Sequence, residues 1–308
     1  HVSSVSFDET TVAVESALAT SGLVLHAKHD VRVPEDKHRA RVYVLTSPAY
    51  AAAAKAEAAR TISAQILRLA VYTHGADQQT YVNMANPVAH AMVFYADSKN
   101  YDALLAAARS ASGEMRQLVA DIPGDAMAEQ LEPLRSEKHY NKFKGDGPAR
   151  MMAKFRTFEK SQLLIAEDTA ENFDTVVDNV KRALSSSTVS GIDESTGWEQ
   201  VAAIKLRDDA VYIGVTNPYI EDKMVRINSR FRSEGKSDES PYPGVDHVAA
   251  LPTDILVIKD SGKTLVLHYG QMWRMQLYFW DSGYRAFTAN VGVPSAIANS
   301  IEDTLRAE

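Results

Sequence analysis

The residues best suited to carry out chemistry lie in the segment from His268 to Trp280, which contains two tryptophans, two methionines and one histidine. Such a segment could line an apolar ligand pocket or provide axial ligands to haem, because histidine and methionine both bind iron. The same residue types are enriched in interfaces, and a core or interface role is the favoured interpretation. The ligand-binding hypothesis would use His268, Met272, Trp273, Tyr278 and Trp280.

Two alternatives involve a redox centre. A haem or metal held near His268, Met272 and Met275 would make this a redox protein. His1 offers an α-amino nitrogen beside an imidazole, a pair that chelates copper where further ligands exist. The sequence does not identify such ligands, so a terminus without chemical significance is favoured. No cofactor is predicted, and haem and copper stay as alternatives.

Other reactive groups give weaker signals. His26, His29 and His38 are close in sequence, but residues three apart on a strand point to opposite faces, so they are predicted to be exposed or edge histidines. The chain has no cysteine, which excludes disulfides, thiolate zinc sites, iron–sulfur clusters and a cysteine nucleophile. It also lacks a glycine-rich phosphate loop, an HExxH motif, a GxSxG elbow and EF-hand spacing.

Charge and hydropathy limit the partners. The net charge of −7 argues against a general binder of nucleic acid or anionic membranes. Arg135–Lys160 interleaves basic and aromatic residues as single-strand binders do, but pairing of these cations with the acidic domains is favoured. No apolar run reaches the ~20 residues that span a bilayer. The start at His1 rather than Met favours a periplasmic or secreted protein, with a cytoplasmic one as the alternative.

The elements that must position these residues occur twice. Apolar residues at helical spacing begin each half, and both sets follow the same i, i+4, i+7, i+11 pattern: Phe7, Thr11, Val14, Leu18 and Phe173, Val177, Val180, Leu184. A strand that ends at a proline recurs as Arg41–Pro48 and Ala210–Pro218. A third block, Thr80–Ser98, matches the sequence 184 positions later. Three blocks in one order indicate an internal duplication.

The repeat predicts an α+β fold of two tandem two-layer domains. Each domain is expected to have a mainly antiparallel sheet with helices on one face. The predicted boundaries are 1–121 for the first domain, 122–157 for a linker and 158–308 for the second domain. Arg230–Asp246, which is rich in Ser, Gly, Pro and charge, is predicted to be an exposed loop.

These blocks resemble a known family, domain of unknown function 302 (DUF302), which has the TT1751-like fold. The resemblance is carried by Phe7-Asp8 and Phe173-Asp174, by Ser47-Pro48 and Asn217-Pro218, by Leu251-Pro252, by Asn86-Pro87 and by the Asp260–Thr264 hairpin. It covers about two thirds of the chain. A Pro-Cys pair common in the family is Pro252-Thr253 here, and the family has no settled activity, so the resemblance implies a fold and no mechanism.

The favoured function is a non-enzymatic binding or assembly protein with a protein partner or self-assembly. Two copies in one chain commonly replace a homodimer, so the halves are predicted to pair about a pseudo-two-fold axis. The contact is expected in or beside the aromatic residues Phe94, Tyr95, Tyr278, Phe279 and Trp280. If that segment is a strand, Tyr278 and Trp280 share one face, which the other half would cover.

Overall fold

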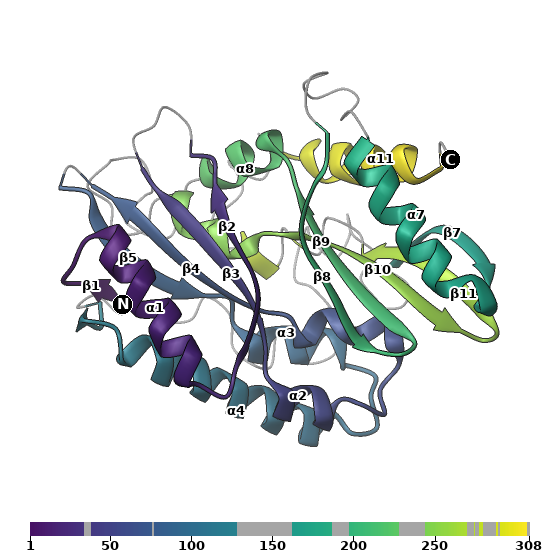
Figure 1. Cartoon of the computed structure of the whole chain (residues 1–308), viewed down its shortest axis with the longest axis horizontal. Coiled ribbons are helices and arrows are strands. Elements are labelled where there is room, and N and C mark those ends of the chain that lie inside the picture. Colours follow the sequence, from purple (N-terminus) through teal and green to yellow (C-terminus); the bar gives the residue numbers. More distant parts are fainter. Residues whose placement is uncertain are drawn as a thin grey trace.

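The computed structural model describes residues 1–33, 38–75, 77–127, 162–186, 197–227, 244–269, 274, 277–279, 288 and 290–306 (Figure 1). The elements of the first half are β1 Val2–Ser3, α1 Phe7–Thr20, β2 Val24–Val31, β3 Ala40–Thr46, α2 Pro48–Ala53, the 3₁₀ helix η2 Ala59–Gln65, β4 Leu67–His74, β5 Gln79–Met84, α3 Pro87–Phe94, α4 Tyr101–Ala120 and β6 Gly124–Asp125. Those of the second half are β7 Gln162–Thr169, η4 Ala170–Asn172, α7 Phe173–Ser186, β8 Glu199–Arg207, β9 Ala210–Thr216, α8 Pro218–Val225, η6 Gly244–Ala250, β10 Thr253–Asp260, β11 Lys263–Tyr269 and α11 Val293–Arg306.

Each half has one antiparallel sheet, and the strand orders match. The first sheet runs β2-β3-β4-β5-β1-β6, and the second runs β7-β11-β10-β9-β8, which is the same order read from the other end with β7 in the place of β1. The α+β class predicted from the repeat is therefore confirmed. Two helix-forming blocks also match, because α1 begins at Phe7 and α7 begins at Phe173.

The register of the two sheets matches as well. Val44 of β3 pairs with Arg68, and Gly214, at the same distance from the end of β9, pairs with Asp254. Both edge strands also carry a register irregularity at the same point, between Leu25 and Ala27 in β2 and between Gln200 and Ala202 in β8. Arg68 and Asp254 therefore occupy equivalent positions. This agreement supports the duplication hypothesis, which stays a prediction about descent.

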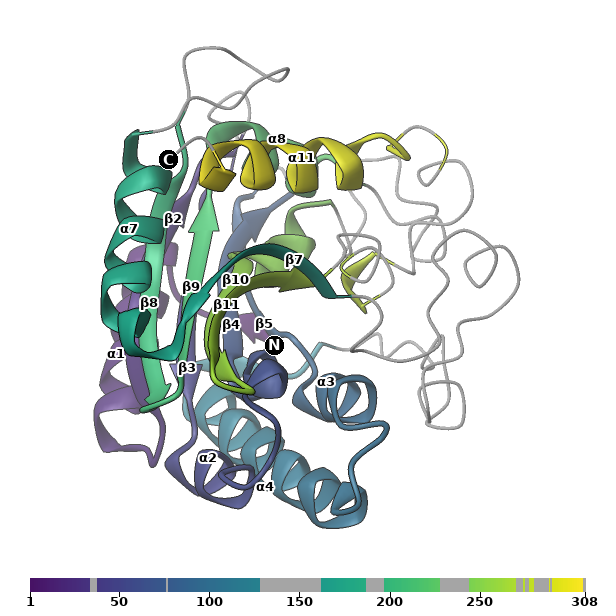
Figure 2. The ribbon, with the colours of Figure 1, turned by 90° about the vertical axis from the view of Figure 1, so that its right-hand side faces the viewer.

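Helices cover one face of each sheet, as predicted. In the first half, α1 and α4 bury Val14 and Leu104 against Tyr43, Leu45 and Leu69 of the sheet. In the second half, α7 and α11 do the same over β9 and β10. Figure 2 shows α4 below the strands of the first sheet, with α8 and α11 at the opposite edge of the molecule. The alternation of side chains along each strand leaves a second, equally apolar face.

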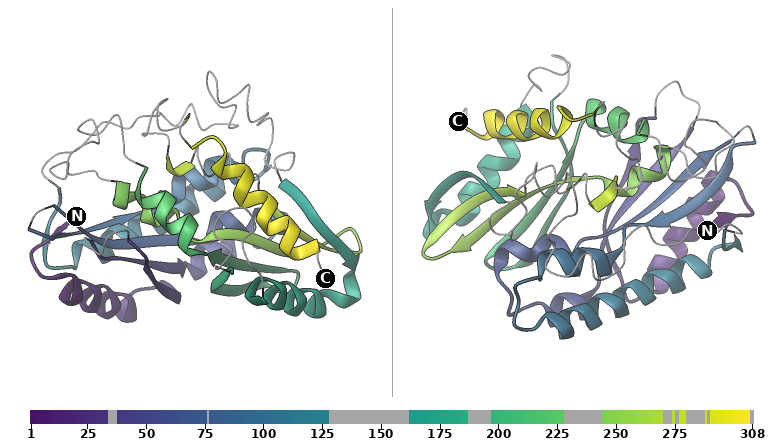
Figure 3. Two further views of the ribbon diagram at one scale, coloured as in Figure 1. Left: turned by 90° about the horizontal axis from the view of Figure 1, so that it is seen from above. Right: turned by 180° about the vertical axis from the view of Figure 1, so that it is seen from behind.

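Those second faces meet across a contact between the halves that we call the seam (Figure 3). From the first half, η2 places Ile62 against Tyr212, Leu256 and Ile258 of the second sheet. From the second half, η6 places Val248 in one core with residues of the first sheet, among them Val42, Ala70 and Tyr72. The 3₁₀ helix of each half therefore packs on the sheet of the other half. Pairing of the halves about a pseudo-two-fold axis stays a prediction.

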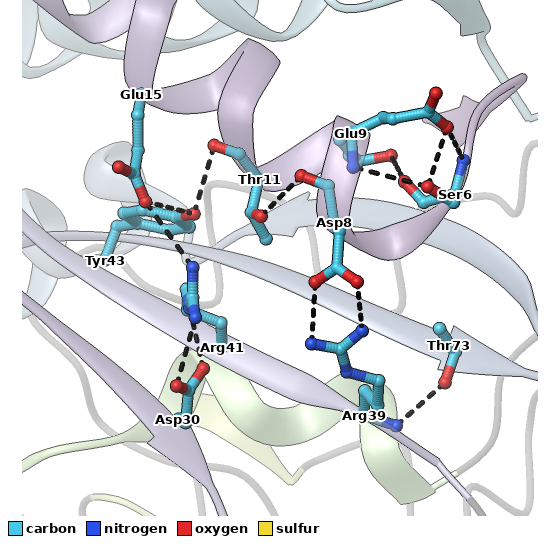
Figure 4. A network of polar contacts seen from close by, with 11 residues as sticks. Ser6, Asp8, Glu9, Thr11, Glu15, Asp30, Arg39, Arg41, Tyr43 and Thr73 are labelled. Atoms are coloured by element: carbon cyan, nitrogen blue, oxygen red, sulfur yellow. Dashed lines mark hydrogen bonds and ion pairs between the residues drawn. The ribbon is translucent and has the colours of Figure 1, made fainter.

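A charged network fastens α1 to the edge of the first sheet (Figure 4). Arg39 donates hydrogen bonds of 2.9 and 2.7 Å to the Asp8 carboxylate at the start of α1. Arg41 of β3 donates bonds of 2.6 and 3.0 Å to Asp30 of β2, and its Nη1 lies 3.5 Å from Glu15 of α1. Each of these two guanidinium groups is paired with a carboxylate, so the network has a structural role.

Three sequence predictions need correction. The predicted linker begins too early, because Gly124–Asp125 pairs with β1. The predicted loop 230–246 ends too late, because η6 starts at Gly244 and buries Val245 and Asp246 in the seam. The third repeat block ends in a helix rather than a strand: Asn86 caps α3 and Pro87 suits its first turn. The rest of the predicted linker, 128–157, and of that loop, 230–243, lies outside the described residues.

Candidate functional site

The centre of the seam holds a buried ion pair. Arg68 of β4 and Asp254 of β10, with side chains 0% and 1% exposed, lie 2.5 Å apart between Nη2 and Oδ1. Tyr212 of β9 donates its hydroxyl to the same carboxylate oxygen at 3.0 Å, and burial raises the pKa of this phenol well above its ordinary value. Removing two charges from water is costly, and the close geometry compensates that cost.

A second arginine stands beside this pair. Arg274 Nη1 lies 3.9 Å from Asp254 Oδ1, and its two terminal nitrogens donate to the carbonyl oxygens of Pro252, at 3.1 Å, and Ala250. Tyr278 accepts a hydrogen bond of 3.1 Å from Arg68 Nη1. The ring of Tyr278 lies near both guanidinium groups, with centroid distances of 5.9 and 5.5 Å. Tyr278 thus joins the second half to the first.

His90 of α3 also belongs to this cluster. Its ring meets Tyr278 edge-on at 5.4 Å between centroids. Burial, and next the charge of Arg68, lower the pKa of His90 from 6.5 to about 3. His90 is therefore neutral at physiological pH. The cluster contains the guanidinium groups of Arg68 and Arg274 and the carboxylate of Asp254.

An apolar pocket adjoins this cluster on the side of the second half. It opens to solvent, has a cavity volume of about 30 Å³, and lies between α8 and α11, which are neighbours along one edge of the molecule (Figure 1). A cavity of this volume takes about two water-sized groups, so a ligand would bury only a small end in it. The described residues that line the pocket are Ile220, Lys223, Met224, Ile227, Arg274, Phe279, Asn290, Val293, Pro294 and Ile297.

The first half fills the corresponding place with aromatic rings. Ser47 and Asn217 cap α2 and α8 in the same way, so Tyr50 and Ile220, whose backbone nitrogens they bind, are equivalent. Tyr50 is buried and meets Tyr95 edge-on at 6.5 Å between ring centroids. The smaller Ile220 instead forms part of the pocket wall.

The opposite side of α8 is tied to the first half. Glu221 is fully buried, and its carboxylate lies 2.6 Å from His29 Nε2 of β2. It also accepts a bond of 2.9 Å from the backbone nitrogen of Arg32. This contact fixes α8 between the seam and the pocket, so the wall of the pocket is held by both halves.

Of the residues named for the predicted segment, Tyr278 belongs to the cluster around Arg68, and Arg274, which was not named, lines the pocket. Tyr278 lies in the seam, as expected for the predicted contact, but residues 277 and 278 are helical, so the predicted strand alternation is wrong. His268 is buried in β11 and lies 3.4 Å from Glu302 of α11, outside the pocket lining. Met272, Trp273, Met275 and Trp280 lie outside the described residues.

The other predicted aromatic contacts divide between the halves. Phe94 and Tyr95 belong to the core of the first half, and Phe279 packs on His247 of η6 with 4.8 Å between ring centroids. His26 lies 2.8 Å from Thr46 on its own sheet.

No candidate metal centre emerges from the described part of the chain. The α-amino group of His1, the copper alternative, donates a hydrogen bond of 3.0 Å to the carbonyl oxygen of Val82. Within the described ranges, no group of three or more His, Asp or Glu side chains is placed to hold a metal. None of the described helices is long and apolar enough to cross a membrane.

Comparison with protein-family models, curated proteins and solved structures finds no match for this chain. The resemblance to the DUF302 family stays a prediction, and function must be argued from the geometry.

Sequence reasoning missed the two residues at the centre of the seam. Arg68 lies between Leu67 and Leu69, and Asp254 directly precedes the apolar run that begins at Ile255. Lysine, arginine, aspartate and glutamate are almost never fully buried unless they are paired. A charge next to the apolar run of a buried strand could therefore have indicated a partner on another element.

Proposed function

We propose that this is a small-molecule binding protein whose ligand occupies the pocket between α8 and α11. The observation that supports the proposal is the pocket itself, which opens to solvent and has an almost wholly apolar surface. Ligand sites in proteins are lined predominantly by apolar groups. The difference from the first half adds to it, because an aromatic residue fills the equivalent place there.

The seam supplies the rigidity that such a site needs. One wall, α8, is bound to β2 through Glu221 and His29, and Arg274 is fixed by two carbonyl oxygens of the segment that precedes β10. A pre-formed pocket loses less entropy on binding than a flexible one. The second half provides the ligand site, and the first half braces it.

The test is a titration followed by the NMR signals of the methyl groups in the pocket. Methyl-labelled protein is titrated with octanol, octanamide and octanoate, and we expect shifts at Ile220, Met224 and Ile297 with none at Ile62 in the seam. Ile220→Tyr gives the second half the residue that the first half uses, and it is expected to lower the affinity by at least about tenfold by filling the pocket.

Thermal unfolding of Ile220→Tyr, and the unchanged Ile62 signals, establish that the variant is folded. Ile62→Val serves as the matched seam substitution and should leave binding unaffected. The proposal is wrong if none of the three compounds shifts the pocket methyl groups, or if folded Ile220→Tyr binds them as the parent protein does.

A further inference from the structure

We propose that the ligand enters the pocket by a small aliphatic end and keeps its polar group in the solvent. This inference rests on the ligand-binding function proposed above and names the chemical class of the ligand. It is supported by the partners of the polar groups around the pocket, by the volume of the cavity and by its opening to solvent.

The two cationic side chains in the pocket lining have their charged groups placed elsewhere. The two terminal nitrogens of Arg274 donate hydrogen bonds to the carbonyl oxygens of Pro252, at 3.1 Å, and Ala250. The ammonium group of Lys223 lies over the ring of Tyr219, 5.4 Å from its centroid. Lys223 therefore contributes its aliphatic stem to the pocket, as long charged side chains commonly do at an apolar surface.

The start of α11 adds no backbone donor from the two residues that line the pocket there. Pro294 has no N–H group, and the backbone nitrogen of Val293 donates to the carbonyl oxygen of Asn290 at 3.0 Å. A helix N-terminus binds an anion through N–H groups that these two residues do not offer. The surface of the pocket is accordingly almost wholly apolar. A polar group buried there would lose its hydrogen bonds to water and gain few in return.

The volume of the cavity limits the buried part of the ligand. At about 30 Å³ it takes about two water-sized groups, which is the size of the last carbon atoms of an alkyl chain. A phenyl ring is larger. The walls include closely packed side chains such as Ile220 and Ile297, which are 1% and 4% exposed and would have to shift to admit a ring. Because the pocket opens to solvent, the rest of the ligand lies outside the cavity.

The orientation of the ligand is tested with octanol and with octanediol, which has the same chain with a hydroxyl group at each end. Octanediol has no aliphatic end, so either orientation buries a hydroxyl group. We expect it to bind at least about tenfold more weakly than octanol at the methyl groups of Ile220, Met224 and Ile297. Octanol, octanamide and octanoate should bind within about threefold of one another, because their head groups stay in solvent.

The size of the buried end is tested with phenylpentanol, an alcohol that ends in an aromatic ring. The parent protein should bind it at least about fivefold more weakly than octanol, because the ring overfills the cavity. Ile220→Val removes one methyl group from the wall and should narrow that difference by about two- to threefold. The matched seam substitution Ile62→Val should leave the difference unchanged.

The two proposals fail on different results. Equal binding of octanediol and octanol, equal binding of phenylpentanol and octanol, or a difference greater than about threefold among the three head groups would overturn the aliphatic end and leave the ligand-binding function intact. Binding of none of the probes at the pocket methyl groups would overturn the proposed function.

Discussion

Arg68 and Asp254 hold equivalent places on the central strands of two matching sheets, yet they carry opposite charges. In a pair of identical domains the same residue would face itself across the axis, and like charges would repel. A single chain with two halves permits opposite charges at that point. The pair therefore favours the association of one half with the other over its association with a second copy of itself.

Arg68→Met tests the energetic role of this pair. The substitution keeps the apolar stem of the side chain but leaves the buried Asp254 with the Tyr212 hydroxyl and the more distant Arg274 alone, so the free energy of unfolding should fall by about 3–5 kcal/mol. Urea denaturation gives the value. Arg116→Met, at an exposed position of α4, is the control and should change stability by about 0.5 kcal/mol or less. If Arg68→Met lowered the free energy of unfolding no more than Arg116→Met does, the prediction would be wrong.

At the scale of elements, α1 depends on side-chain contacts as well as on apolar packing. It begins with a capping box, in which Ser6 and Glu9 each bind the backbone nitrogen of the other. Arg39, just before β3, binds Asp8 of α1, and Arg41 of β3 binds Asp30 of β2 and lies close to Glu15 of α1 (Figure 4). The hydrogen bond from Arg41 lowers the pKa of Asp30 below its ordinary value of 3.8, and Arg39 does the same for the pKa of Asp8.

The lowered pKa values predict a pH dependence of stability. A carboxylate whose folded pKa lies below 3.8 contributes fully above that pH, and its contribution disappears as the pH falls through the folded pKa. Asp30→Asn should therefore destabilise at pH 7, by at most about 1 kcal/mol because the pair is partly exposed, and should destabilise less near pH 2. Urea unfolding at both pH values measures this. The exposed Asp97→Asn is the control, and an equal cost of Asp30→Asn at both pH values would contradict the prediction.

At the scale of the whole molecule, the seam makes each half part of the other's core. Because η2 covers the second sheet and η6 covers the first, neither sheet is closed on both faces within its own half. The two halves are therefore expected to unfold together, as domains with large apolar interfaces do. The pocket, whose α8 wall is bound to β2, belongs to the same cooperative unit.

Ile62→Ala tests this coupling across the seam. All three tryptophans, Trp198, Trp273 and Trp280, belong to the second half, so their fluorescence reports its unfolding alone, whereas circular dichroism reports both halves. The two transitions should coincide in the parent protein. Although Ile62 lies in the first half, Ile62→Ala should lower the free energy of unfolding obtained from both signals by the same amount. That amount is expected to be about 2–5 kcal/mol, the usual cost of such a cavity.

Val12→Ala on the exposed surface of α1 is the control for that substitution. It should change the free energy of unfolding obtained from either signal by no more than about 0.5 kcal/mol. Two separate transitions, or a fluorescence transition that is insensitive to Ile62→Ala, would show that the halves are independent domains.

Local patterns were sufficient to determine most elements of this chain. The spacing of Phe7, Val14 and Leu18 is that of a helix face, and β3, β9, β10 and β11 follow from their apolar runs and turns. These features depend on neighbours in the sequence, which is why they were predictable. The strand interpretation of Tyr278 failed because a short apolar run has no periodicity that separates a strand from a helix, and α3 was missed in the same way.

The site was decided only by tertiary structure. Arg68 and Asp254 are 186 residues apart, and no local pattern reveals that two lone charges will meet at 2.5 Å. The pocket requires α8, α11 and Arg274 to converge, and it exists where Ile220 replaces the tyrosine of the first half. By itself the sequence determined the elements, their repetition and the α+β class, because these follow from short-range stereochemistry and burial. The tertiary structure decided which face of each sheet meets the other half and where Arg68 meets Asp254, because these depend on contacts between residues far apart in the chain.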